Sequence, residues 1–235
     1  MKGRNVAFII ILIVLFDQAL KIYIKTNFLL EDSRPIFGEW AYLNFVENPG
    51  AAWGAKIAGS AGKLSLTLFR MIAVIFGTWY LVNIIKKKYH KGFIICAAMI
   101  YAGALGNLID SSFYGMIFDK GMIPDPSDPS GHEYLGYSGL AEFSKHGYAS
   151  FLHGNVVDMF YFPMLKGTFP SWFPFWGDQK FVFFSPVFNI ADAAISSGVI
   201  TVLIFQKRFF KHQDDNKQHP TVETGALSND DVQVQ

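Results

Sequence analysis

Acidic side chains occur in this sequence at positions where the surrounding residues are apolar. Asp17, Asp110, Asp158 and Asp192 all lie in or beside long apolar runs. A carboxylate at membrane depth costs at least ~2.5 kcal/mol on insertion scales, so its presence there indicates a functional role. Two carboxylates that lie close together share a proton, and one can then activate water while the other polarises a carbonyl. Such a pair could hydrolyse an amide bond.

Three of these aspartates follow an asparagine by three residues: the pairs are Asn107/Asp110, Asn155/Asp158 and Asn189/Asp192. On a helix this spacing puts both side chains on one face, where the amide can orient the carboxylate. The alternative is that each pair only satisfies the end of its own helix. The segment around Asp158 is expected in a loop or at a helix start. Spacing alone does not decide whether Asp110 or Asp158 is the partner of Asp192.

Other reactive groups give weaker signals. Asp17 and Lys21 are four residues apart in the first apolar run, so they can pair on one helix face. His132-Glu133 lacks the second histidine of a zinc-binding HExxH helix, and no metal site is expected. Cys96 stands alone within an apolar run and is expected to serve packing only. Ala98, Ala102 and Gly106 recur every fourth residue and predict close helix contact.

The elements that carry these residues are membrane spans. The chain has 235 residues, 51% hydrophobic and 17% charged, whereas soluble domains carry about 25% charged residues. A span needs about 20 apolar residues, and four stretches qualify: 6–24, 64–85, 92–109 and 187–205. Pro186 is expected to set the start of the last one. Together they predict a four-span domain over 1–205 with connecting loops at 27–63 and 110–185.

Basic residues near the spans predict the topology. They precede the first span, fill the turn between the second and third, and follow the fourth (Lys2, Arg4, Lys86, Lys87, Lys88, Lys91, Lys207, Arg208 and Lys211). Basic short loops stay cytoplasmic, so both termini are expected in the cytoplasm and both long loops outside it. A net charge of +1 gives no general basis for binding nucleic acid.

Three regions outside the spans differ in composition. Residues 119–154 form a long non-cytoplasmic insert that could fold as a small cap. The aromatic-rich residues 169–184 are typical of a membrane–water interface. Residues 206–235 are polar and are predicted to be a disordered cytoplasmic tail. Arg70, in the second span, is expected to extend its side chain to the non-cytoplasmic surface.

Five motifs, in this order, resemble the lipoprotein signal peptidase family, also called signal peptidase II, the bacterial aspartic endopeptidases of lipoprotein maturation. They are residues 16–21 (FDQALK), 47–54 (ENPGAAWG), 103–110 (GALGNLID), 156–158 (VVD) and 188–192 (FNIAD). The resemblance implies an all-α membrane protein of four transmembrane helices, with an extramembrane β-rich cradle over 27–63. It also implies a bacterial inner-membrane location.

The resemblance implies a reaction and its residues. The family removes the signal peptide from a diacylglyceryl-modified prolipoprotein and cuts before the lipidated cysteine. Its catalytic pair matches Asp158 and Asp192. Residues expected to bind substrate or support the pair are Asn48, Gly50, Asn107, Asp110, Asn189, Asp17 and Lys21. No metal or organic cofactor is implied, because water is the nucleophile; membrane lipids and the inhibitor globomycin are implied partners, and a monomer suffices.

Two departures from the family pattern affect the site. An arginine usually follows the aspartate of the third motif, but Ser111 follows Asp110 here, so Arg70 or Lys120 is a candidate substitute. The connection from Asp110 to Asp158 is also longer than is typical. A small proton- or cation-coupled transporter is the alternative, since intramembrane carboxylates also form ion relays, and a non-enzymatic membrane scaffold is a third possibility.

Overall fold

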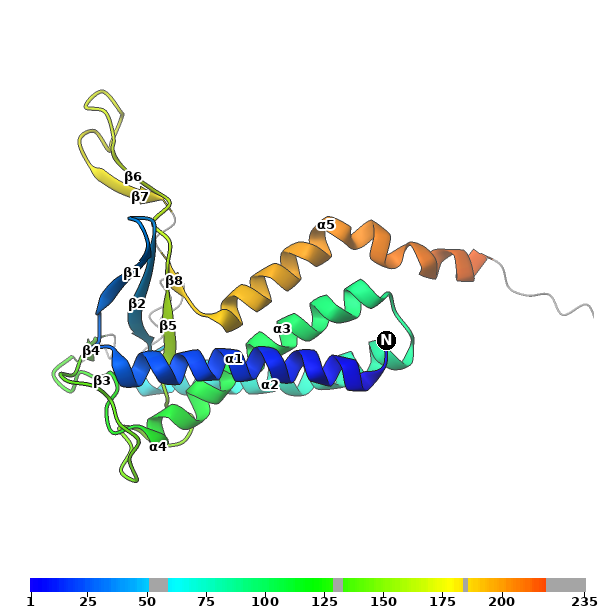
Figure 1. Ribbon diagram of the computed structural model, residues 1–235, viewed down its shortest axis with the longest axis horizontal. Coiled ribbons are helices and arrows are strands. Elements are labelled where there is room, and N and C mark those ends of the chain that lie inside the picture. The colour runs from blue at the N-terminus through cyan, green and yellow to red at the C-terminus, as the bar shows by residue number, and fades with distance from the viewer. Residues whose placement is uncertain (51–58, 129–132, 184–185, 219–235) are drawn as a thin grey trace, which may run out of the picture.

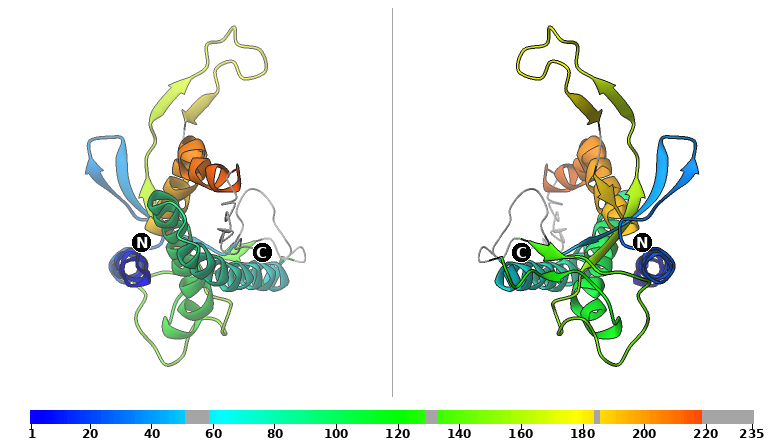
Figure 2. Two further views of the ribbon diagram at one scale, coloured as in Figure 1. Left: turned by 90° about the vertical axis from the view of Figure 1, so that its right-hand side faces the viewer. Right: turned by 90° about the vertical axis from the view of Figure 1, so that its left-hand side faces the viewer.

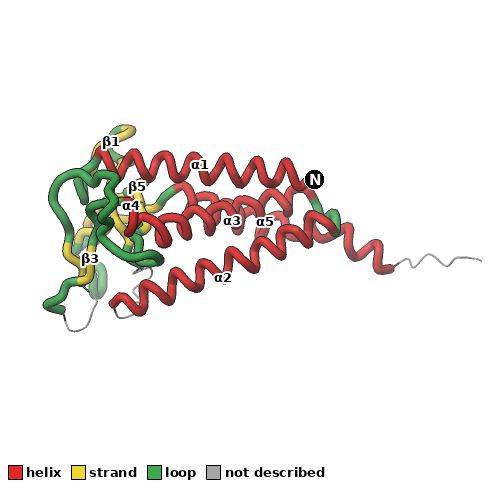
Figure 3. The backbone as a smooth tube through the Cα atoms, turned by 90° about the horizontal axis from the view of Figure 1, so that it is seen from below, coloured by secondary structure: helices red, strands yellow, loops and turns green. Residues whose placement is uncertain are grey.

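Four long helices form the body of the protein in this computed structural model, which describes residues 1–50, 59–128, 133–183 and 186–218. They are α1 (Gly3–Asn27), α2 (Gly59–Lys86), α3 (Lys91–Ile109) and α5 (Ile190–Gln218), and they run alongside one another (Figure 1 and Figure 3). Four stretches are long and apolar enough to cross a membrane: Gly3–Asn27, Gly62–Lys86, Lys91–Ile117 and Ile190–Phe210. The third continues beyond α3 to residue 117. The expectation of four helices able to cross a membrane is therefore confirmed, as for a multi-pass membrane protein.

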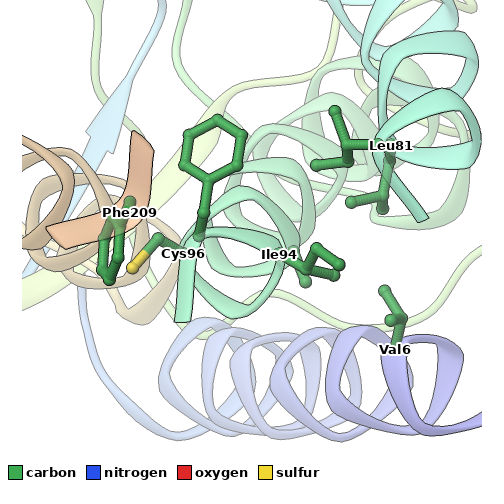
Figure 4. Packing of buried hydrophobic residues seen from close by; sticks show 8 residues of the cluster. Val6, Leu81, Ile94, Cys96 and Phe209 are labelled. Atoms are coloured by element: carbon green, nitrogen blue, oxygen red, sulfur yellow. The ribbon is translucent and has the colours of Figure 1, made fainter. Parts of the chain in front are cut away.

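The central helix is α3, which packs against α1, α2 and α5. A buried cluster that includes Val6, Ile94 and Phe209 joins all these helices (Figure 4). Close contact at the expected small residues is seen at Gly106, where a Cβ atom would lie 2.7 Å from Asp17 Oδ2 and 3.3 Å from the Ala191 Cβ. Gly103, outside that stripe, lies closer still, because its Cβ would be 2.2 Å from the backbone oxygen of Ala191. The start of α5 is thereby held against the middle of the bundle. Cys96 is buried in the same cluster.

Helix α5 differs from its sequence prediction at both ends. It begins at Ile190, because the side chain of Asn189 accepts a hydrogen bond from the backbone N–H of Asp192 at 2.9 Å and so caps the helix. The start predicted from Pro186 is wrong, since Val187 and Phe188 form a strand.

The other end of α5 extends beyond Phe205 to Gln218, although φ and ψ at Phe205 are not helical. The predicted disorder of residues 206–218 is therefore wrong. The helix continues because Phe209 is buried against Phe93 and stacks on His90, with ring centroids 6.3 and 5.1 Å apart respectively. The tail beyond 218 lies outside the described residues.

A four-stranded antiparallel sheet lies at one end of the helices (Figure 1). Its order is β1 (Ser33–Phe37), β2 (Ala41–Asn48), β5 (Val156–Tyr161) and β8 (Val187–Phe188). The region 27–63 thus supplies two of its strands. Asp158 lies on β5, opposite Val46 of β2, so the loop or helix start expected at Asp158 is wrong. With eight strands among the described residues, the expected all-α class is too narrow.

The expected insert, residues 119–154, follows two short helical elements that extend α3. The helix continues through a π-helical turn, η2 (Asp110–Tyr114), into α4 (Gly115–Ile117), and the strands β3 (Ile123–Pro124) and β4 (Tyr134–Leu135) follow. A second apolar core joins this segment to the sheet and to the end of α1; its buried members are Ile24, Phe28, Phe45, Tyr114, Phe118, Ala141, Val157 and Met159. The segment therefore packs against the sheet.

A separate hairpin, β6 (Leu165–Thr168) and β7 (Lys180–Phe183), projects sideways from the sheet end of the bundle (Figure 2). Three aromatic side chains near its tip are exposed: Trp172, Phe175 and Trp176. The two ends of the segment that contains this hairpin are held together, because Val187 of β8 lies opposite Tyr161 of β5.

Candidate active site

Asp158 and Asp192 come from different kinds of element that meet at the sheet end of the helices. Asp158 is buried on β5, and Asp192 lies half-buried in the first turn of α5. Asn189 connects them. Its side-chain amide donates to Asp158 Oδ1 at 2.7 Å, and its side-chain oxygen accepts from the backbone N–H of Asp192 at 2.9 Å. The cap of α5 therefore fixes the helical carboxylate relative to the one on the strand.

Asn107 of α3 holds the second carboxylate from the other side. Its side-chain amide donates to Asp192 Oδ1 at 2.8 Å. Its oxygen accepts from the Asn189 amide at 3.1 Å and from Lys21 Nζ at 2.8 Å. Since both asparagine side chains are buried and hydrogen-bonded through both polar atoms, each has one fixed orientation.

Asn48 ends β2 beside the strand aspartate. Its amide lies 3.4 Å from Asp158 Oδ2, and its oxygen accepts from the backbone N–H of Gly50 at 2.9 Å. Gly50 has φ of +105°, a conformation that favours glycine. The motif residues that follow, 51–54, lie outside the described residues.

Asp110 occupies a different environment from Asp158. It forms an ion pair of 2.7 Å with Lys21, whose ammonium also pairs with Asp17 at 2.9 Å. Gln18 donates to Asp110 Oδ1 at 2.8 Å, and the backbone N–H of Val157 lies 3.3 Å from its Oδ2. These contacts occupy both oxygens of Asp110, and the predicted pairing of Asp17 with Lys21 is confirmed.

The Asp17 carboxylate also reaches α5. Its Oδ1 accepts from the backbone N–H of Ala191 at 2.9 Å, one of the N–H groups that the helix itself leaves unpaired. The buried charge cluster of α1 and α3 therefore supports the same helix start that carries Asp192.

The strand aspartate is poised to carry a proton. Burial, followed by the negative charge of nearby Asp192, raises the pKa of Asp158 to about 7. Among the described residues, no cation lies within ion-pair distance of either Asp158 or Asp192. Two carboxyl groups that lie close together can share one proton. This is the arrangement with which a pair of aspartates activates water.

Comparison with known proteins identifies the family. A family model described as signal peptidase (SPase) II matches residues 9–208. The chain belongs to the signal peptidase II family. The lipoprotein signal peptidase of Porphyromonas gingivalis is 43% identical over 210 residues, covering 88% of this chain and 84% of that protein. The lipoprotein signal peptidase of Amoebophilus asiaticus is 31% identical over 221 residues, covering 93% and 84%.

Solved structures resemble the fold of this signal peptidase II family member. Two structures described as bacterial membrane enzymes align with TM-scores of 0.53 and 0.52, at 22% and 24% identity. The first covers 94% of this chain and 95% of its own, and the second 86% and 92%. The overall fold is thus shared with structures described as membrane enzymes.

Arg70, a candidate substitute for the arginine that the family resemblance implies after Asp110, contacts the residue at that position. Arg70 of α2 donates from NH1 to Ser111 Oγ at 2.6 Å, and Ser111 donates onward to the backbone oxygen of Asn107 at 2.9 Å. Arg70 therefore contacts the position at which the family usually has arginine. Lys120, the other candidate, binds the exposed backbone oxygen of Leu140 instead.

The third asparagine–aspartate pair is not a pair in this signal peptidase II structure. Asn155 directly precedes a strand, so residues three apart lie on opposite faces. Its amide donates to Glu47 Oε2 at 2.6 Å and to the backbone oxygen of Met122 at 2.9 Å, away from Asp158. The interpretation from helical spacing is wrong here because the segment is extended.

Sequence reasoning also missed several polar residues. Gln18 and Ser111 belong to the contacts around Asp110 and Asn107. Lys25 and Glu47 form a second ion pair that is fully buried. The signal for Lys25 was present, because it follows Lys21 by four residues and so continues the same helix face.

Proposed function

We propose that this chain is an aspartic endopeptidase that removes the signal peptide from diacylglyceryl-modified prolipoproteins, cutting before the lipidated cysteine. Membership of the signal peptidase II family supports the reaction. The observation that supports the assignment of the catalytic pair is the bridge through Asn189, whose side chain binds the Asp158 carboxylate and the backbone N–H of Asp192. No cofactor is required, since the two carboxyl groups and water suffice.

The two aspartates have different roles in this proposal. Asp192 lies in the first turn of α5, where the helix dipole favours a negative charge, so it is the base. Asp158 carries the proton, because its pKa is raised to about 7, so it is the acid. Asn107 holds the base, and Asn189 and Asn48 orient the acid.

The reaction then balances in two steps. Asp192 takes a proton from water as the water oxygen bonds to the scissile carbonyl carbon, and Asp158 donates its proton to the carbonyl oxygen. A neutral tetrahedral diol results. When the C–N bond breaks, Asp192 returns its proton to the leaving amine and a hydroxyl proton passes back to Asp158. The pair ends in its starting protonation state.

The position of the site suits a lipid-anchored substrate. Asp158 lies on β5 and Asp192 in the first turn of α5, and Figure 1 shows this sheet at one end of the spanning helices. Acyl chains that stay in the bilayer would hold the scissile bond at that depth. Gly50, with its unusual backbone conformation, lies beside Asn48 and could let the substrate backbone approach closely. Lys21, Asp17 and Asp110 support the site rather than contact substrate.

The membrane orientation follows from charge. The N-terminus, the α2–α3 turn and the C-terminal part of α5 lie at the end of the bundle opposite the sheet (Figure 3), and basic residues gather there in the sequence. We therefore propose that both termini are cytoplasmic, that the sheet and the 119–154 insert lie outside the inner membrane, and that the protein works as a monomer sensitive to globomycin. The transporter alternative gains no support, because the described carboxylates of the site gather at one end of the bundle.

The test is cleavage of a diacylglyceryl-modified prolipoprotein by the purified full-length chain, followed by gel shift. Asp158→Asn and Asp192→Asn should each abolish cleavage while membrane insertion is retained. Asp178→Asn is a matched control, because Asp178 is an exposed aspartate of the β6–β7 hairpin with positive φ, which asparagine tolerates. Full cleavage by either dyad variant would overturn the assignment.

A further inference from the structure

A second buried charge cluster lies behind the strands that carry the site. Lys25 of α1 and Glu47 of β2 form an ion pair in which both side chains are fully buried. The proposed reaction uses neither residue. A buried pair of this kind is costly to desolvate and persists only where its remaining donors and acceptors are satisfied.

The cluster and the site occupy opposite faces of one strand pair. Asn48 lies opposite Val156, and Asp158 lies opposite Val46, so these residues share one face. Glu47 lies opposite Val157 and points to the other face. A shift of β2 against β5 would therefore move Glu47 and the Asn48–Asp158 contact together.

Contacts from the insert converge on the Glu47 carboxylate. Tyr137 donates its hydroxyl to Oε1 at 2.7 Å, and the backbone N–H of Met122 donates to Oε2 at 2.8 Å. Both residues belong to the segment between α4 and β5. Burial, and next the charge of Glu47, raise the pKa of Tyr137, which keeps its hydroxyl protonated as a donor.

The same segment holds the start of β5. Asn155 bridges Glu47 and the backbone oxygen of Met122, with distances of 2.6 and 2.9 Å from its amide. Its own backbone N–H donates to the Tyr148 hydroxyl at 2.8 Å, and Lys63 of α2 donates to its side-chain oxygen. One carboxylate thus ties together both strands and the insert.

The insert also encloses the cation of the pair. The Lys25 ammonium lies 5.1, 5.4 and 5.2 Å from the ring centroids of Phe118, Tyr137 and Tyr148, within the range of cation–π attraction. All three rings come from the connection between α3 and β5. Without this connection the Lys25–Glu47 pair would lose its aromatic surroundings as well as the Tyr137 hydrogen bond.

We propose that Glu47 is a positioning residue through which the insert, residues 119–154, fixes β2 against β5 and so holds Asn48 in contact with Asp158. The insert is then part of the catalytic unit rather than a separate cap. This inference rests on the proposed function, because it concerns the alignment of the acid in that reaction.

Tyr137→Phe is the sharpest test, because it removes the hydroxyl bound to Glu47 and keeps the ring beside Lys25. We expect kcat to fall, by about tenfold or more, with KM unchanged, since small misplacements far from the chemistry can cost up to ~100-fold. Weakening the Asn48 hydrogen bond also raises the pKa of Asp158, so the alkaline limb of the kcat profile should move to higher pH. A loss of correctly folded protein alone would lower kcat by the same factor at every pH and would not shift the alkaline side of the profile.

Three further variants complete the experiment. Tyr134→Phe, the same change elsewhere in the insert, should behave as wild type. Glu47→Gln should shift the limb as Tyr137→Phe does. In an Asn48→Ala background Tyr137→Phe should cause no additional shift, because its effect acts through Asn48.

Every other result contradicts the inference. The inference is overturned if the wild type cleaves substrate and Tyr137→Phe has an unchanged kcat and pH profile. It is also overturned if kcat falls without a shift of the alkaline limb, or if only KM changes. Absence of cleavage by the wild-type chain would instead overturn the proposed function itself.

Discussion

Asn189 lies 2.7 Å from Asp158 through its side-chain amide, and the same side chain caps the helix on which Asp192 lies. An N-cap is ordinarily a local device that satisfies one helix end. Here its second polar atom reaches a carboxylate on a strand, so a single side chain stabilises α5 and aligns the two acidic residues.

Asn189→Ser should separate these two roles. Serine is a good N-cap but has no amide to donate to Asp158. We expect a small change in melting temperature and a loss of cleavage of about 100-fold, comparable to the removal of one preorganised donor. Asn189→Ala should lose the same activity and, in addition, about 1 kcal/mol of stability. Full activity in the serine variant would show that the Asn189–Asp158 contact is dispensable.

The pH dependence of cleavage should reflect Asp158. Because Asp158 acts as the acid and its pKa is raised to about 7, kcat should fall as the pH rises through about 7. The measurement is a pH–rate profile under saturating substrate. Activity that keeps rising well above this pH would contradict the role of Asp158 as the proton donor.

The same shift predicts a stability gain on removing the acid. The ordinary pKa of aspartate is about 3.9, so between about pH 4 and 7 the folded carboxyl keeps a proton that the unfolded chain has released. The contribution of the Asp158 carboxyl to the free energy of unfolding of the wild type therefore decreases as the pH rises from about 4 to 7. Asparagine does not titrate, so the melting temperature of Asp158→Asn relative to wild type should increase from pH 4 to 7 and then level off. A difference that stays constant with pH would contradict the raised pKa.

Arg70 should contribute to activity through Ser111. Since it donates to Ser111 Oγ, which in turn binds the backbone of Asn107, Arg70→Ala should lower kcat by about tenfold. The kcat of Arg70→Lys should lie between those of the wild type and Arg70→Ala, because lysine retains the positive charge but lacks the planar guanidinium. Arg34→Ala, at an exposed ion pair with Asp32, serves as the control and should leave cleavage unchanged.

Lys21 and Asp110 should affect folding as well as activity. Lys21→Met leaves two buried carboxylates, Asp17 and Asp110, without their shared cation. Breaking a buried pair costs about 3–5 kcal/mol, so this variant should be strongly destabilised in detergent. Asp110→Asn leaves the Lys21–Asp17 pair in place and should retain partial activity. A loss as complete as that of Asp158→Asn would reopen the assignment of the catalytic pair.

The sequence predicted the membrane spans and the Asp17–Lys21 pair because both depend on local periodicity. Hydropathy locates the spanning helices, and a spacing of four residues on a helix leaves little choice of face. Close helix contact at α3 was also predicted, because Ala98, Ala102 and Gly106 recur every fourth residue, but this spacing did not identify α5 as a partner.

The strand that carries Asp158 could not be predicted in the same way. Val156, Val157, Asp158 and Met159 are all buried, so the segment has no alternation of apolar and polar residues to indicate a strand. Its pairing with β2 joins residues far apart in sequence, and only tertiary packing determines it. The error in the Asn155–Asp158 pair follows directly from this missing strand.

The two ends of α5 illustrate competing local signals. Pro186 and Asn189 are both residue types that commonly precede a helix. The helix begins after Asn189 because Val187 and Phe188, which lie between them, pair with β5 as strand β8. At the far end, polar residues suggested disorder, but Phe209 finds an apolar partner on α3.

The β6–β7 segment leaves and rejoins the sheet at paired residues, so its length does not affect the relative position of the two aspartates. Because Tyr161 and Val187 are already paired, residues between them can be added or removed at modest entropic cost without displacing β5 or the start of α5. The tip of that hairpin is accordingly a suitable place to insert an epitope or a fluorescent reporter into the working enzyme.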